Sequence, residues 1–235
     1  MTADPTTLTL AFGKGLLFAL ATMLPFLNPA ATAPIFLGLT AGASTPVRAL
    51  LARRISRYMF AIVTVSMLVG SYVLDFFGIS LPIVRVGGGL IVASAAWRLL
   101  NAAAPVADGR SAPTEPLTPE QAKRQAFYPL TFPIACGPGS IAAAITVGVS
   151  LHHQRLPLTL AGTAGALVGV ALIGVALYLA LRYAEQLLRP LGEAGTVVFL
   201  RLSAFILLCL GVQIVWTGAS ELLGELLAGA ATARH

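Results

Sequence analysis

The chain has 235 residues, the size of one ordinary soluble domain, but its composition excludes that class. Hydrophobic residues make up 57% of the sequence and charged residues only 10%, against roughly 25% in soluble domains. Too few polar side chains remain to cover a water-soluble globule, so we expect the lipid bilayer as the solvent. The net charge of +6 reflects a scarcity of acidic residues, so we expect no nucleic-acid partner.

Runs of uncharged sequence predict six membrane-spanning segments, because one span needs about 20 mostly apolar residues. The segments cover residues 8–41, 49–74, 81–103, 124–151, 157–181 and 196–227. The sequence therefore predicts an all-α polytopic membrane protein. Residues 1–103 form a first group of three segments and residues 124–235 a second group, and together they make one integrated membrane domain. Residues 104–123, rich in proline and charge, form the linker between the groups.

Basic residues gather at alternate segment ends, and basic loops remain in the cytoplasm. One side holds Arg48, Arg53, Arg54, Arg57, Arg98, Arg110, Lys123, Arg124, Arg182 and Arg189. The other side holds Lys14, Arg155 and Arg234. We therefore place the linker and the basic loops in the cytoplasm and both termini outside a bacterial-type inner membrane. A first segment that turned back as a re-entrant hairpin would change this assignment of sides.

Segments one and four share a proline pattern that predicts broken helices. The spacing P-x3-P-x4-P occurs in both, as Pro25, Pro29 and Pro34 in the first and as Pro129, Pro133 and Pro138 in the fourth. The third segment of each group also opens alike, with Arg85-Val86-Gly87 and Arg201-Leu202-Ser203. Two copies of an odd number of segments enter the membrane from opposite faces, which gives two inverted three-helix repeats and favours a transporter.

The proline breaks expose backbone polarity inside the membrane, since proline removes one amide donor and obstructs the carbonyl four residues earlier. Freed carbonyls attract an ammonium group, and the amides of a half-helix restarting near Pro34 or Gly139 attract a carboxylate. We expect substrate contacts from Asn28, Thr32, Thr131, Gly137, Gly139 and Ser140. The alternative is that the prolines only kink two structural helices, whose polar groups satisfy their own backbones.

Arg85 and Arg201 occupy equivalent repeat positions, where each could extend its side chain to the interface, gate the site or bind a substrate carboxylate. The pair Gly165-x3-Gly169 predicts either close helix packing or contact between subunits. The sequence contains no HExxH, GxSxG or nucleotide-binding Gly-Lys-Ser/Thr motif and no Cys/His cluster. We therefore expect no enzyme activity, no cofactor and no metal site.

The stretches from Asn28-Pro29 to Thr40 and from Phe132-Pro133 to Ile141 resemble the motifs of the MarC family, bacterial and archaeal membrane proteins also called the neutral amino acid transporter family. The resemblance extends over nearly the whole chain. It implies transport of small neutral amino acids such as glycine or alanine, using a proton or sodium gradient. The family often has glycine after Asn-Pro, where this sequence has Ala30.

Pattern and resemblance together predict a secondary transporter that works by alternating access at a site between the two broken helices, alone or as a homo-oligomer. Two alternatives remain open at this point. The first is a channel for small neutral solutes, and the second is a membrane interaction protein that transports nothing. Saturable, uphill accumulation of a substrate distinguishes a transporter from a channel.

Overall fold

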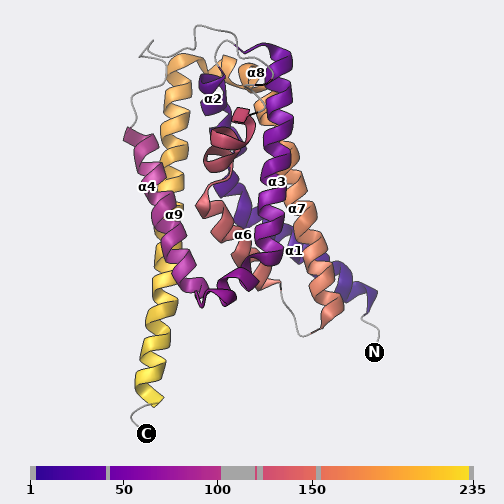
Figure 1. Ribbon diagram of the computed structural model, residues 1–235, viewed down its shortest axis with the longest axis vertical. Helices are drawn as coiled ribbons and strands as arrows, with labels where there is room; N and C mark the ends of the chain where they lie inside the picture. The colour runs from indigo at the N-terminus through magenta and orange to yellow at the C-terminus, as the bar shows by residue number, and fades with distance from the viewer. Residues whose placement is uncertain (1–3, 41–42, 102–119, 121–123, 152–154, 233–235) are drawn as a thin grey trace.

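The computed structural model describes residues 4–40, 43–101, 120, 124–151 and 155–232, and its regular elements in these ranges are all helical (Figure 1). The predicted linker, residues 104–123, lies outside the described residues except for Glu120. In chain order the elements are α1 (Pro5–Leu27), α2 (Pro29–Leu39), α3 (Thr45–Phe76), α4 (Leu81–Asn101), η1 (Ala126–Ala135), α6 (Pro138–Ser150), α7 (Leu156–Arg182), α8 (Ala184–Leu188), η2 (Arg189–Leu191) and α9 (Gly192–Thr232).

Several of these helices are long and apolar enough to cross a membrane. Among the described residues four meet that condition: Pro5–Leu39 taken as one span, Thr45–Phe76, Leu156–Arg182 and Ala194–Leu227. The bent pair of η1 and α6 makes a fifth. Helix α4, which holds Arg85 and Arg98 within its 21 residues, is not among them. The all-helical membrane class predicted from composition is confirmed, with four or five spans by length and composition.

The surface of the bundle has the character of a lipid-facing surface. Large apolar side chains are exposed on the long helices, including Leu17 on α1, Val65 on α3, Leu160 on α7 and Val198 on α9. Extensive exposure of this kind is unfavourable in water and is expected where acyl chains surround the protein. The buried core is a single apolar cluster to which α1, α2, α3, η1, α6 and α7 contribute.

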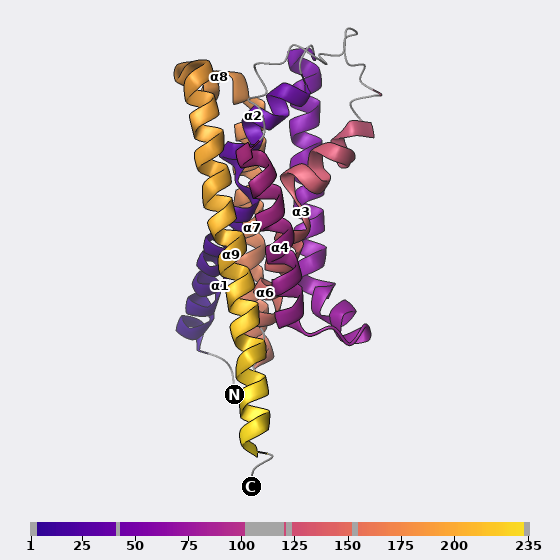
Figure 2. The ribbon, with the colours of Figure 1, turned by 90° about the vertical axis from the view of Figure 1, so that its left-hand side faces the viewer.

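The broken elements lie in the middle of the bundle. Helix α4 packs along α9, α1 packs along α7, and α3 packs against both α6 and α7. Figures 1 and 2 show α4 and α9 side by side, and Figure 1 shows α2, η1 and α6 between this pair and α3 with α7. The start of α1 and the end of α9 lie at the same end of the bundle (Figure 1).

Glycines bring the backbones of α1 and α7 into contact. A Cβ atom placed on Gly15 would lie 2.0 Å from the carbonyl oxygen of Gly162, and one placed on Gly165 would lie 2.0 Å from that of Phe12. Helices in membranes associate through such small residues because van der Waals packing, rather than the hydrophobic effect, holds them together. Gly165 and Gly169 therefore face α1 of the same chain, as the prediction of close helix packing requires.

Gly15→Ala should lower the unfolding temperature of the purified protein in detergent, because its methyl group would overlap the backbone of α7. Overpacking of this kind costs about 1–3 kcal/mol. Gly13→Ala is the matched control on the same helix, with no atom within 4 Å of the added Cβ, and should leave the unfolding temperature unchanged or raise it. Equal unfolding temperatures for the two variants would contradict close packing at Gly15.

Candidate functional site

The first break separates α1 from α2 at one residue, Asn28. Its backbone has φ 27° and ψ 73°, in the left-handed region that asparagine tolerates better than most residues. The backbone amide of Asn28 donates to the carbonyl oxygen of Leu24 at 2.9 Å, and this bond ends α1. Its side-chain oxygen Oδ1 accepts from the amide of Ala31 at 3.1 Å, which caps α2. One residue thus satisfies backbone groups on both sides of the break, with its backbone amide on the α1 side and its side chain on the α2 side.

The second break lies between η1 and α6, and it bends the chain by 67°. Within η1, Tyr128 and Phe132 have extended backbones, as expected for residues that precede prolines. Both of the following peptide bonds, to Pro129 and Pro133, are cis. Cys136 is also extended, and its backbone amide donates to the carbonyl oxygen of Thr131 at 2.8 Å.

The two breaks fall at different prolines of the shared pattern. Helix α2 begins at Pro29, the middle proline, and α6 begins at Pro138, the last one. The expectation that the first half-helix restarts near Pro34 is therefore wrong, because Asn28 caps the helix six residues earlier and Pro34 lies buried inside α2. Pro25 similarly lies inside α1. The restart near Gly139 is confirmed, since Gly139 is the second residue of α6.

Two of the predicted hydroxyl groups satisfy backbone carbonyls at the breaks. Thr32 is buried and donates to the carbonyl oxygen of Asn28 at 3.0 Å. Thr131 is fully buried and donates to the carbonyl oxygen of Ala126 at 2.6 Å. These two side chains therefore have the arrangement expected if the prolines only kink structural helices, because each hydroxyl group donates to a carbonyl of its own backbone segment.

A cavity of about 300 Å³ lies beside the breaks, where α1, α4, α6 and α9 meet. Thr22 and Phe26 line it from α1, within two turns of the first break, and Gly139 lines it from the first turn of α6. A Cβ atom on Gly139 would lie 1.9 Å from Cγ2 of Val92, so the absence of a side chain there lets α6 lie directly against α4. The cavity therefore joins both broken elements to the two packed helices α4 and α9.

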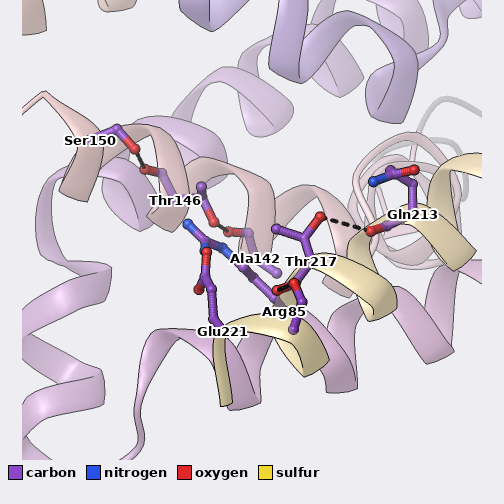
Figure 3. A network of polar contacts seen from close by, with 8 residues as sticks. Arg85, Ala142, Thr146, Ser150, Gln213, Thr217 and Glu221 are labelled. Atoms are coloured by element: carbon purple, nitrogen blue, oxygen red, sulfur yellow. Dashed lines mark hydrogen bonds and ion pairs between the residues drawn. The ribbon is translucent and has the colours of Figure 1, made fainter. Parts of the chain in front are cut away.

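Opposite charges meet at this cavity. The guanidinium of Arg85 on α4 forms an ion pair with the carboxylate of Glu221 on α9, and Figure 3 shows the two side chains pointing toward one another. The Arg85 side chain is only 16% exposed, whereas that of Glu221 is 41% exposed. A charge so nearly buried is costly unless a counter-charge faces it. Thr217, one turn before Glu221, adds a hydroxyl group to the lining and donates to the Gln213 carbonyl at 2.9 Å.

The structure brings only part of the predicted site to this cavity. Gly139 and Arg85 line it. The residues that lie at or near the breaks without lining it are Asn28, Thr32, Thr131, Gly137 and Ser140. Arg201 is exposed on α9, and it makes no ion pair with any residue that the structure describes. The equivalent repeat positions of the two arginines thus have unequal surroundings.

Sequence reasoning gave Glu221 no role in the site. Its partner Arg85 is 136 residues away, so no local motif connects the two charges. The usable signal was the spacing of Ile214, Thr217 and Glu221, which places two polar residues on one face of an apolar helix. No group of three or more metal-ligating side chains occurs within the described ranges.

The family comparison agrees with these motifs. The sequence model described as "MarC family integral membrane protein" matches residues 14–223. The chain belongs to the MarC family. It is 33% identical over 212 residues to the "UPF0056 inner membrane protein MarC" of Escherichia coli O1:K1 / APEC, covering 89% of this chain and 96% of that protein.

Proteins with the same printed name in Citrobacter koseri and Salmonella typhimurium are similarly related to this MarC family member. Each is 33% identical over 213 residues, again covering 89% of this chain and 96% of the relative. No solved structure matches the chain.

Replacing Asn28 tests whether this side chain caps α2. Asn28→Ala removes the cap and places an unsuited residue at positive φ, so the free energy of unfolding should fall by about 0.5–2 kcal/mol. Asn28→Gly also removes the cap but tolerates the backbone angle, and should cost only a few tenths of a kcal/mol. Thermal unfolding of both variants in detergent measures the difference, and an alanine variant as stable as the glycine variant would contradict this role.

Proposed function

We propose that the chain is a secondary transporter of small neutral amino acids, with its binding site in the cavity between α1, α4, α6 and α9. The observation that carries the proposal is the Arg85–Glu221 ion pair, whose arginine side chain is only 16% exposed, in a small cavity beside two proline breaks. An ion pair presents one positive and one negative group, as an amino acid zwitterion does. The substrate carboxylate would bind Arg85, and the substrate ammonium group would bind Glu221.

The cavity also suits a small substrate. Its volume of about 300 Å³ lies at the lower end of the range of ligand pockets, roughly 300–1,000 Å³. Phe18 and Phe26 offer an apolar wall to a short side chain, while Thr22 and Thr217 offer hydroxyl groups. Glycine, alanine and serine fit this description.

We further propose six spans in two inverted three-helix repeats, with α4 as the third span. Helix contacts support this arrangement. Exchanging the two repeats pairs α1 with α6, α3 with α7 and α4 with α9. This exchange converts the α1–α7 contact into the α3–α6 contact and leaves the α4–α9 contact unchanged. Contacts related in this way are expected from a pseudo-two-fold axis in the membrane plane.

Transport would follow from alternating access around the cavity. When substrate occupies the two charges, the Arg85–Glu221 bond between α4 and α9 is replaced by bonds to the substrate, which frees the two helices to separate. A proton gradient, or a sodium gradient as the alternative, would drive accumulation of the substrate. The basic helix ends would face the cytoplasm, in keeping with the inner-membrane name of the relatives.

Uptake into liposomes tests the proposed function. Purified protein should accumulate labelled alanine, glycine and serine under an imposed proton or sodium gradient. Arg85→Gln and Glu221→Gln should each lower uptake at least tenfold, since each leaves one charge of the zwitterion and one charge of the protein unpaired. Arg98→Gln is the control, as it removes an exposed arginine of the same helix outside the cavity. Absence of substrate-dependent flux under every gradient would overturn the proposal.

Competition for alanine uptake tests the size of the site. Unlabelled glycine and serine should compete with labelled alanine, whereas phenylalanine and tryptophan should compete poorly at tenfold higher concentration, because their rings would have to pack beside Phe18 and Phe26, which already line the cavity. Equal competition by alanine and tryptophan would place the substrate elsewhere.

The two alternatives give different results in the same liposomes. A channel would equilibrate solute without saturation and would not accumulate it against a gradient. A membrane interaction protein would show no flux, and cells carrying Arg85→Gln would keep the function that is lost on deleting the protein.

A further inference from the structure

A second cavity lies on the outside of the bundle, and none of the residues that line it lines the cavity at Arg85. It is a groove of about 710 Å³ between α3 and α7, more than twice the volume of the cavity at Arg85. Arg53 and Arg57 line the groove near the start of α3, and Tyr178 lines it near the end of α7. Phe60 and Val175 continue it toward the middle of the two helices.

The positive end of the groove has no internal counter-charge. Arg53 and Arg57 are four residues apart on one face of α3, and both are exposed. Like charges at this spacing repel one another, so the pair favours binding of an anion. The ion pairs among the described residues are Arg48–Glu185 and Arg85–Glu221, and neither involves these two arginines.

A buried hydroxyl group in the groove also lacks a partner. Ser56 lies between the two arginines in sequence, lines the groove, and is 8% exposed. Its Oγ atom has no hydrogen-bond partner among the described residues. A buried hydroxyl group without a partner is unfavourable, so a ligand oxygen that accepts from Ser56 would stabilise this part of the protein.

The remainder of the lining is apolar and faces outward between two helices that are long enough to span the membrane. Val175 is 54% exposed, and Phe60 and Ala171 extend the apolar surface beside it. Tyr178 stands at the charged end, where tyrosine is typical of the boundary between acyl chains and headgroups. The groove therefore has one anion-binding end and one hydrocarbon-binding end.

We propose that this groove is a binding site for one anionic phospholipid. The phosphate would contact the guanidinium groups of Arg53 and Arg57, one of its oxygens would accept from Ser56, and an acyl chain would lie along Phe60 and Val175. Basic pockets between spanning helices recognise anionic headgroups by the same charge complementarity. The site is separate from the proposed transport site and does not depend on it.

Native mass spectrometry of the purified protein tests the proposal, using phosphatidylglycerol and phosphatidylcholine with identical acyl chains. Phosphatidylglycerol should bind about thirtyfold more tightly than phosphatidylcholine, as expected for two arginines near a headgroup. The double variant Arg53→Gln/Arg57→Gln should lose this preference. Arg98→Gln/Arg189→Gln, which removes two exposed arginines outside the groove, should retain it. Equal binding of the two lipids, or equal loss in both double variants, would overturn the proposal.

A second variant separates a lipid from a free anion. Ala171→Phe fills the apolar part of the groove and leaves both arginines in place, so it should weaken phosphatidylglycerol binding at least tenfold. Glycerol phosphate, which has no acyl chains, should not displace the lipid from the unaltered protein. Displacement by glycerol phosphate, or full binding by the Ala171→Phe variant at an unchanged unfolding temperature, would show an anion site and contradict a lipid site.

Discussion

The constraint behind this structure is that hydrocarbon offers no hydrogen bonds to an interrupted backbone. A helix broken inside the membrane must therefore satisfy its free groups with its own side chains or with neighbouring protein. Asn28 does so at the first break by capping α2, and Thr131 does so near the second by bonding the Ala126 carbonyl. For the same reason both breaks lie in the interior, between the α4–α9 pair and α3 with α7.

The breaks have a consequence for the helices around them. Because α6 starts at a bend and carries Gly139 in its first turn, it approaches α4 closely and a small cavity remains beside the contact. Arg85 lies in this cavity, where a nearly buried guanidinium requires a negative partner, and Glu221 supplies it from α9. In the proposed transport cycle, a substrate that carries both charges would take the place of that internal pair. Proline spacing, helix packing and charge pairing thus support the same site.

Much of the fold could be predicted because spans follow from apolar length. Residues 49–74 and 157–181 correspond to α3 (Thr45–Phe76) and α7 (Leu156–Arg182). Proline also predicts the breaks. The shared proline spacing predicts the first restart near Pro34, whereas the capping side chain of Asn28 decides that α2 begins at Pro29. Glu221 was not identified, since its pairing with Arg85 depends on how distant helices pack.

The most direct test of the central claim is whether the cavity beside the breaks is open to water and to substrate. Ala142 lines it and is nearly buried, so Ala142→Cys in a protein without Cys136 and Cys209 reports on access. A membrane-impermeant thiol reagent should modify this cysteine from either side of the membrane, and alanine should slow the reaction. If the folded protein is never modified from either side, or if alanine leaves the rate unchanged, the cavity is not a transport site.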